Sequence, residues 1–260
     1  MKRQAKNSAL KVEQLSVNYD KTSVLWEIYC EIPEGKMVGI IGPNGAGKST
    51  FLKTLLGMTH PLSGHIEFFG KPYKKVRRRI AYVPQRSSVD WDFPVTAFEV
   101  VLMGRYGKLG YFKWVSASDR LAAKKVLEMV GMLPFADRQI SQLSGGQQQR
   151  LFIARALLQD ADLYLMDEPF AGVDIATERA IIDLMDQLKA KGKTLLVVHH
   201  DLSTVADYFD WVLMFNTCLV ASGPTKEVFH TETIMRTYGR TCALLDEAGK
   251  LTQNKRSGIQ

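Results

Sequence analysis

Apolar and polar positions in the first third of the chain follow the patterns of β-strands. Residues 10–17 and 64–69 alternate apolar with polar side chains, which is typical of strands with one buried face. Residues 36–41 form an almost wholly apolar run after a Pro-Glu-Gly turn, and residues 79–83 form a further short run. We therefore expect a strand-rich N-terminal third, with residues 36–41 as a central strand.

The middle of the chain changes to helical spacing. Residues 118–130 place apolar side chains on one face of a helix and charged side chains on the opposite face. The expected buried face consists of Leu121, Ala122, Val126, Leu127, Met129 and Val130. The expected exposed face consists of Asp119, Arg120, Lys124 and Lys125. A helical section should therefore follow the N-terminal strands.

The second half of the chain predicts a mainly parallel sheet. Residues 163–166 and 194–198 are short, continuous apolar runs of the kind found in parallel strands buried on both faces. Residues 176–191 between them have helix periodicity, so a right-handed crossover should join the two strands. Residues 211–215 and 218–222 then predict a hairpin.

Composition agrees with a folded chain and leaves three kinds of partner open. The 260 residues are 46% hydrophobic and 23% charged, which is typical of folded domains and not of disordered segments. Lys and Arg number 34 against 27 Asp and Glu, so the net charge is +7. This basic excess fits nucleic acid, an anionic membrane surface or a phosphate-bearing ligand.

Cysteine spacing and the length of the apolar runs exclude further classes. Cys30, Cys218 and Cys242 form no CxxC pair, which predicts neither a disulfide framework nor a zinc knuckle. This pattern indicates a reduced, intracellular chain. The apolar runs are far shorter than the roughly 20 residues of a membrane-spanning helix, so we expect other chains to supply any membrane part.

A glycine-rich loop carries the clearest chemistry. Residues 42–49 match the pattern GxxxxGK[ST] between the expected central strand and a helical segment, residues 50–56. In such a P-loop the backbone N–H groups surround a phosphate chain, and the helix N-terminus adds its positive dipole end. Lys48 would reach the β and γ phosphates, and Ser49 would bind Mg²⁺. The alternative, a Gly-rich turn without a ligand, is disfavoured by the flanking strand and helix. The loop consists of Gly42, Pro43, Asn44, Gly45, Ala46, Gly47, Lys48 and Ser49.

Two adjacent carboxylates follow the apolar run at residues 163–166. At the carboxyl edge of a parallel strand, Asp167 would hold the Mg²⁺ shell, and Glu168 would face the space beyond the γ-phosphate. Glu168 is then the candidate general base that polarises the attacking water. The alternative is a helix N-cap with an acidic first turn, which the upstream Lys48 disfavours.

A second candidate anion site lies at residues 143–147. Ser144 is a good N-cap for the helical spacing that follows, and Gly145 and Gly146 leave backbone N–H groups free for an anion. The simpler interpretation is a capped helix start. Because the chain already has one phosphate-binding loop, a second anion-binding helix end suggests a site that another copy completes.

Together these residues resemble one family, the ATP-binding subunits of ABC transporters. The segment Leu143, Ser144, Gly145, Gly146 and Gln147 matches the signature sequence of that family, and the resemblance covers about residues 10–229. It implies an α/β, P-loop NTPase fold of the ABC type. That fold has a mainly parallel core sheet, an N-terminal antiparallel β subdomain and a helical subdomain.

The resemblance also implies the domain limits. One ATP-binding domain would span residues 9–240, with the helical subdomain inserted at about 86–160. Residues 241–260 would form a loose basic C-terminal tail.

Further site residues follow from the resemblance. Tyr19 would stack on adenine, and Thr50 would bind ATP together with the loop 42–49. The implied catalytic residues are Glu168, His200 and Gln85, and the implied ligands of the Mg²⁺ of MgATP are Ser49, Gln85 and Asp167. Asp174 matches the D-loop aspartate. His199 would point to the face of the strand opposite His200, so we assign it to packing or a hydrogen bond.

The implied partners are other chains of a transporter. Members of the family work as head-to-tail dimers with ATP between the P-loop of one copy and the signature of the other, so we expect a homodimer or a pair with a similar chain. Integral-membrane permease subunits, and indirectly an extracytoplasmic solute-binding protein, would complete the system. The chain would then be peripheral, at the cytoplasmic face of the inner membrane. Residues 86–105 would receive the permease. Their apolar groove would consist of Val95, Phe98, Val101 and Leu102, unless these side chains are ordinary core.

Within the family, residues 83–86 (Val-Pro-Gln-Arg), 89–94 (Val-Asp-Trp-Asp-Phe-Pro) and 103–107 look like the subgroup that powers uptake of manganese, zinc or iron. Siderophore and cobalamin importers, the alternative, share the Gly-Arg pair but usually lack the 90–94 run. A soluble ABC ATPase acting on nucleic acid is less favoured, because the interval between Lys48 and Ser144 has room only for a small helical subdomain. The basic run at residues 74–79 could be a solvated edge, and we expect no direct nucleic-acid partner.

Overall fold

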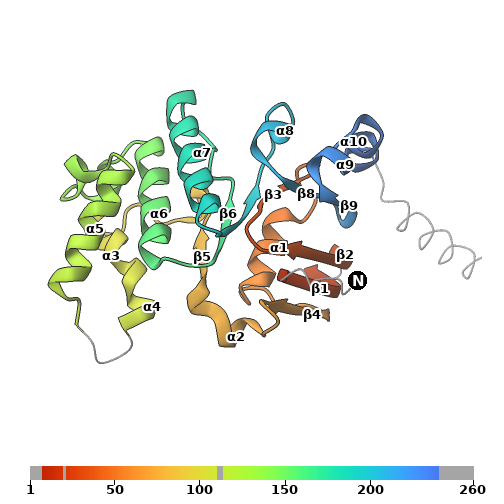
Figure 1. Cartoon of the computed structure of the whole chain (residues 1–260), viewed down its shortest axis with the longest axis horizontal. Coiled ribbons are helices and arrows are strands. Elements are labelled where there is room, and N and C mark those ends of the chain that lie inside the picture. The colour runs from red at the N-terminus through yellow and green to blue at the C-terminus, as the bar shows by residue number, and fades with distance from the viewer. Residues whose placement is uncertain (1–7, 20–21, 110–113, 240–260) are drawn as a thin grey trace, which may run out of the picture.

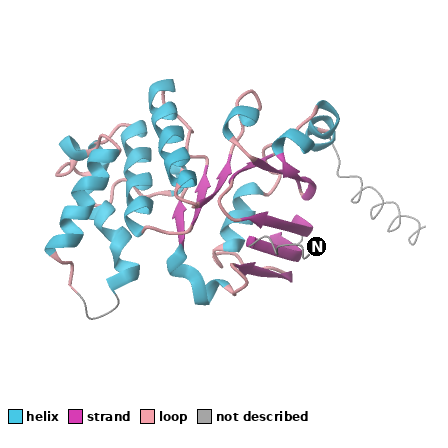
Figure 2. Ribbon diagram, viewed as in Figure 1, coloured by secondary structure: helices cyan, strands magenta, loops and turns pink. Residues whose placement is uncertain are grey.

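The computed structural model describes residues 8–19, 22–109 and 114–239, and its strands form two sheets (Figure 1, Figure 2). One sheet has six strands in the order β5-β6-β7-β3-β8-β9, and the other has three in the order β2-β1-β4. The strands are β1 (Ser8–Tyr19), β2 (Thr22–Pro33), β3 (Met37–Ile41), β4 (Ser63–Phe68), β5 (Ile80–Val83), β6 (Leu163–Asp167), β7 (Thr194–Val198), β8 (Trp211–Asn216) and β9 (Cys218–Pro224).

Helices cover the six-stranded sheet and extend to one end of the molecule, opposite the end that carries the three-stranded sheet (Figure 1). The α-helices are α1 (Lys48–Leu55), α2 (Tyr73–Val76), α3 (Ala97–Leu102), α4 (Tyr106–Leu109), α5 (Ala117–Met129), α6 (Gly145–Gln159), α7 (Ile175–Ala190), α8 (Val205–Tyr208), α9 (Thr225–Val228) and α10 (Thr231–Tyr238). Short 3₁₀ helices are η1 (Arg77–Arg79), η2 (Arg86–Ser88), η3 (Met103–Arg105), η4 (Leu133–Phe135) and η5 (Ile140–Gln142).

The six-stranded sheet is the middle layer of the fold. Its first five strands are parallel, and β9 is antiparallel to β8. Strands β3, β6 and β7 are buried at every residue, and alternate side chains point to opposite faces. Leu196 and Val198 join the core formed with α1 and the three-stranded sheet, whereas Leu195 and Val197 join the core formed with α6 and α7. The prediction of a mainly parallel core sheet is confirmed.

Strand β2 was not among the predicted elements. Its buried residues include Leu25, Ile28 and Cys30, so the alternation of buried and exposed side chains shifts by one position around Glu27. Glu27 has φ 46, and the pairing of β1 with β2 shifts register between Leu15 and Val17. An extra residue of this kind bends a strand and breaks the period of two on which the sequence pattern depends.

The elements described between β5 and β6 are all helices, and α3, α5 and α6 pack on one another. This agrees with a helical section after the N-terminal strands. Its limits as a subdomain at residues 86–160 stay a prediction.

The predicted buried face of the helix at residues 118–130 is partly wrong. Helix α5 buries Asp119, Ala123 and Leu127, whereas Leu121 is 56% exposed and Met129 is 55% exposed. Asp119 is 5% exposed because its carboxylate caps the helix with Ser116 and accepts a hydrogen bond from Arg105 Nε at 2.8 Å. These hydrogen bonds lower the pKa of Asp119 to about 2, and the bonds with Ser116 have the largest effect.

The expected apolar groove is also largely core. Val101 is fully buried, and Leu102 is 5% exposed, because both pack between the sheet and the helices. Val95 and Phe98 are partly buried against the same core. Val101 and Leu102 therefore offer no surface to a permease.

The hairpin at residues 211–222 is confirmed as β8 and β9, which turn at Thr217 with φ 61. No helix in the described ranges is both long and apolar enough to cross a bilayer. Residues 241–260, predicted to be a loose basic tail, lie outside the described residues, as does residue 240 at the predicted end of the domain.

Candidate active site

The P-loop joins the carboxyl end of β3 to the start of α1, as the sequence predicts. Two of its glycines have positive φ and little space around them. A Cβ on Gly42 (φ 154) would collide with the carbonyl oxygen of Phe215. A Cβ on Gly47 (φ 91) would lie 2.6 Å from Leu25 Cδ2 and 2.8 Å from the carbonyl oxygen of Val24. Both positions require glycine, so the neighbouring hairpin and β2 hold the loop in shape.

Lys48 is the first residue of α1, and only 7% of its surface is exposed. Its ammonium group donates hydrogen bonds to the carbonyl oxygens of Gly42 at 2.7 Å and Pro43 at 2.9 Å. Burial lowers the pKa of Lys48, while the nearby carboxylates of Glu168 and Asp167 oppose this effect. The side chain thus crosses the inside of the loop, where a phosphate chain would lie.

Ser49 and Asp167 form the pair expected around Mg²⁺. The hydroxyl of Ser49 donates to Asp167 Oδ1 at 2.9 Å, although the two residues belong to α1 and to the end of β6. Asp167 is 1% exposed, and burial raises its pKa. Two close oxygen donors, one of them a buried carboxylate that a cation would stabilise, suit Mg²⁺.

Glu168 lies in a tight turn immediately after β6, with φ 51. The next helix is α7, which begins at Ile175 with Asp174 as its N-cap, so Glu168 is not part of a capped helix start. Its Oε2 accepts a hydrogen bond of 2.9 Å from Gln85 Nε2. Because β5 and β6 pair in parallel, with Val83 opposite Met166, the residues that follow the two strands come together.

The histidines at the end of β7 have different environments. His199 is 2% exposed, shares a hydrogen bond of 2.8 Å between Nε2 and Thr204 Oγ1, and contacts Phe170. Burial lowers the pKa of His199 to about 4, so its ring is neutral near pH 7. His200 is exposed, with its ring centroid 5.9 Å from that of His199. The expected packing role of His199 agrees with this arrangement.

The signature residues form the start of α6. Ser144 is the N-cap in a capping box with Gln147: the backbone N–H of Ser144 donates to Gln147 Oε1 at 2.9 Å. Gly145 and Gly146 belong to the first turn, and Leu143 is buried in the core. Asp174 caps α7 by accepting from the backbone N–H of Thr177 at 2.9 Å.

The structure therefore joins only part of the predicted site directly. Hydrogen bonds connect Ser49 with Asp167 and Gln85 with Glu168. Ser144 and Asp174 make their described hydrogen bonds within their own helix starts. Tyr19 ends β1, opposite Thr22 of β2.

The sequence places Arg86 in the segment 83–86 that resembles the metal-uptake subgroup, but it does not predict the contact that Arg86 makes. Arg86 Nε donates to Gln148 Oε1 on α6 at 2.7 Å. No motif marks this contact, because it joins a loop to a helix far along the chain.

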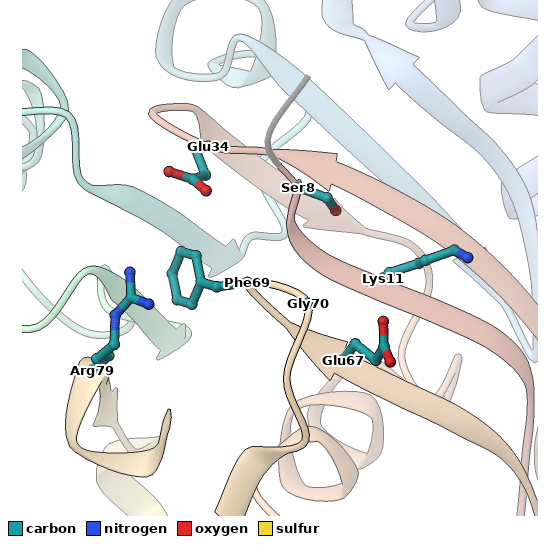
Figure 3. A pocket seen from close by; sticks show the side chains of 7 residues that line it. All are labelled: Ser8, Lys11, Glu34, Glu67, Phe69, Gly70 and Arg79. Carbon is teal, nitrogen blue, oxygen red and sulfur yellow. The ribbon is translucent and has the colours of Figure 1, made fainter. Parts of the chain in front are cut away.

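A separate hollow of about 480 Å³ lies beside the three-stranded sheet (Figure 3). Lys11 and Arg79 line it together with Glu34 and Glu67, so charges of both signs surround the space. Arg79 is also paired with Asp162 at 2.6 Å and lies 4.0 Å from the centre of the Phe69 ring. This mixed lining is unsuited to a triphosphate.

Comparison with known proteins identifies the family. A family model described as "ABC transporter" matches residues 25–171. The manganese transport system ATP-binding protein MntB of Bacillus subtilis is 57% identical over 238 residues, which are 92% of this chain and 95% of that protein. The zinc transport system ATP-binding protein TroB of Treponema pallidum is 57% identical over 231 residues, 89% of this chain and 87% of that protein.

A solved structure agrees with these sequence matches. The crystal structure of a nucleotide-free ATP-binding cassette from an ABC transporter superposes with a TM-score of 0.76 at 27% identity, covering 88% of this chain and 98% of the other. The chain therefore belongs to the ABC transporter family, as an ATP-binding subunit that hydrolyses ATP.

Proposed function

We propose that the chain hydrolyses ATP to energise a membrane permease that imports a divalent metal ion: manganese, zinc or iron. The observation that carries the hydrolytic part is the hydrogen bond of 2.9 Å between Gln85 and Glu168 at the end of the P-loop sheet. The 57% identity to relatives named for manganese and zinc transport supports the choice of cargo. The cargo ion is substrate and would pass through the permease.

The site residues would divide the chemistry among them. Backbone N–H groups of the P-loop and the ammonium group of Lys48 would bind the phosphates, with Lys48 exchanging its two carbonyl partners for phosphate oxygens. Glu168 would take the proton of the attacking water as general base. Gln85 holds Oε2 of that carboxylate, which leaves Oε1 for the water.

We propose Ser49, Asp167 and Gln85 as the ligands that would hold Mg²⁺. When bound, it would neutralise charge on the β and γ phosphates. The chain's own contribution is the fixed placement of the two oxygen donors, which already lie 2.9 Å apart.

Two copies would complete two ATP sites. The start of α6 is a second helix N-terminus, where the first backbone N–H groups, at Gly145 and Gly146, have no partner within the helix, which suits the γ-phosphate of ATP on a partner copy. Tyr19 would stack on adenine, Asp174 would face the partner copy, and His200 would donate to the γ-phosphate. We place the dimer peripherally at the cytoplasmic face of the inner membrane, with an extracytoplasmic solute-binding protein on the other side.

Metal uptake tests this function. We expect cells that lack the chain to lose high-affinity uptake of one of the radiolabelled ions manganese, zinc and iron. Uptake should return with the normal chain and not with Glu168→Gln, because the permease would then have no source of energy. Equal uptake of all three ions in all strains would reject metal import.

The permease would contact a hollow that shares only Met103 and Gly104 with the segment 86–105 expected from the sequence. The hollow has a volume of about 390 Å³ and adjoins the end of α1, the segment α2–η1, η3 and α6. Its lining includes apolar and aromatic side chains and two exposed arginines. These residues include Met58, Tyr73, Tyr82, Met103, Arg77 and Arg78.

Charge decides which partner this hollow suits. Arg77 and Arg78 lie in the basic run and are exposed at the rim of the hollow. The third arginine, Arg155, is directed inward, because its guanidinium donates to the carbonyl oxygen of Tyr82 and stacks on Phe152. An amphipathic segment of the permease with acidic residues beside its apolar ones would match the two exposed arginines and the apolar side chains of the lining.

Reversing this charge should uncouple the chain from its permease. Arg77→Glu with Arg78→Glu should lower permease-stimulated ATP hydrolysis and co-purification with the permease about tenfold or more, because like charges then face each other. Hydrolysis by the isolated chain should not change. The matched control is Lys124→Glu with Lys125→Glu, a reversal on the exposed face of α5. Equal effects of the two pairs, or none from the first, would reject this docking face.

A further inference from the structure

Gln85 and Arg86 stand at the boundary between the sheet and the helical part of the chain. Gln85 Nε2 contacts Glu168 at 2.9 Å, directly after β6. Arg86 Nε contacts Gln148 at 2.7 Å, in the first turns of α6. Two neighbouring residues are therefore attached to opposite sides of the site: one to the carboxylate assigned as base, and one to the helix that carries the signature.

Arg86 is held against the start of α6 by more than one contact. Its guanidinium lies against Gly145, where a Cβ would be 2.8 Å from Nη1 and 3.0 Å from Cζ. Gln148, which accepts from Arg86, is 4% exposed and donates through Nε2 to the carbonyl oxygen of Ile140 at 3.2 Å. The acceptor of the Arg86 hydrogen bond is thus fixed in the helical core.

The turn that contains Arg86 is itself packed on α6. The indole N–H of Trp91 donates to the carbonyl oxygen of Arg86 at 2.9 Å, and the Trp91 ring meets Phe152 of α6 edge-on at 5.1 Å. The hydroxyl of Ser88 donates to the carbonyl oxygen of Gln85 at 2.7 Å. Arg86 and Trp91 thus attach the segment 86–91 to α6, and Gln85 directly precedes this segment.

We infer that Arg86 is a positioning residue for ATP hydrolysis: through Gln148 it ties the Gln85 segment to the signature helix, so that the place of α6 sets the hydrogen bond between Gln85 and Glu168. This inference rests on the roles proposed for Gln85 and Glu168.

The electrostatics of the helix N-terminus indicate that the hydrogen bond to Gln148, and not the helix dipole, holds Arg86 at this place. The N-terminus of a helix is positive, so a guanidinium beside Gly145 is not attracted there by the helix dipole. The charge-assisted hydrogen bond to Gln148 offsets that unfavourable placement. A general base needs its carboxylate oriented toward the water, and small displacements of a positioning group lower the rate strongly.

Removing the Arg86 contact should slow catalysis without weakening ATP binding. We expect Arg86→Ala in the purified chain to lower kcat about tenfold, the size of one lost charge-assisted hydrogen bond. The KM for ATP and the melting temperature should stay near their normal values, since the P-loop is untouched. Arg86→Met, which keeps the aliphatic part of the side chain but removes the guanidinium that lies against Gly145, should be equally slow. Ser87→Ala, an exposed residue of the same turn, is the matched control.

A double-mutant cycle separates positioning from a merely structural effect. If Arg86 acts through Gln85, adding Arg86→Ala to Gln85→Ala should change kcat less than about twofold. Independent, multiplying effects of the two substitutions would overturn the inference, as would a normal kcat in both Arg86 variants. Failure of the proposed site itself is distinguishable, because Glu168→Gln would then hydrolyse ATP normally whatever Arg86 does.

Discussion

Replacing Glu168 by Gln is expected to abolish ATP hydrolysis while ATP remains bound. The amide has almost the shape of the carboxylate and can still accept from Gln85, but it cannot take a proton from water. Loss of a general base lowers the rate by about a hundredfold to ten-thousandfold. Phosphate release by the purified chain with MgATP measures the effect.

The same variant should accumulate as a dimer that contains ATP, because in the proposed dimer the ATP between the two copies would no longer be cleaved. Size-exclusion chromatography with ATP, against the normal chain under the same conditions, would reveal the heavier species. Glu128→Gln, an exposed carboxylate on α5, is the matched control and should behave normally. Normal turnover by Glu168→Gln would remove Glu168 as the base.

Replacing Lys48 by Ala is the second change with a large expected effect, and it should remove ATP binding. Only 7% of the surface of Lys48 is exposed, and its ammonium group donates hydrogen bonds to the carbonyl oxygens of Gly42 and Pro43 in the P-loop. Charge-assisted bonds to two phosphates in such a site contribute enough that the Kd for ATP should rise by about a hundredfold or more. Calorimetric titration with MgATP measures this directly.

Two further variants make the Lys48 result specific. Lys48→Met keeps most of the side-chain volume, so equal loss of binding would assign the effect to the charge and not to a cavity. Lys36→Ala removes an exposed cation just before β3, at the end of that strand opposite the P-loop, and should leave the Kd unchanged. Unchanged ATP affinity in Lys48→Ala would contradict the assignment of the P-loop.

Much of the fold could be predicted because its signals are local. Strands β3, β6 and β7 are buried on both faces, so each is a continuous apolar run that stands out in the sequence. The P-loop is recognised in the same way, because its glycines, Lys48 and Ser49 act within eight consecutive positions.

Other elements could not be predicted because their pattern depends on distant contacts. The alternation of β2 slips at Glu27, where the pairing with β1 accommodates an extra residue. Asp119 was assigned to the exposed face of α5, yet its hydrogen bonds with Ser116 and Arg105 bury it. An argument from periodicity assigns each polar residue to the exposed face, because the hydrogen-bond partner that would allow its burial is not known from the sequence.

The candidate site likewise has parts that local sequence patterns predict and parts that depend on distant contacts. The sequence shows Asp167 and Glu168 as two carboxylates that follow a buried strand, and it shows Gln85 after another strand. The hydrogen bond between Gln85 and Glu168 depends on the parallel register of β5 and β6. By itself the sequence determined the family, the P-loop, the carboxylate pair and the buried strands, since each is encoded by adjacent or regularly spaced residues. Only the tertiary structure decided which side of α5 is buried, how Gln85 reaches Glu168 and what Arg86 contacts. All three features depend on the packing of segments far apart in the chain. Hydrogen bonds between such segments produce no regular spacing of residues that the sequence pattern could show.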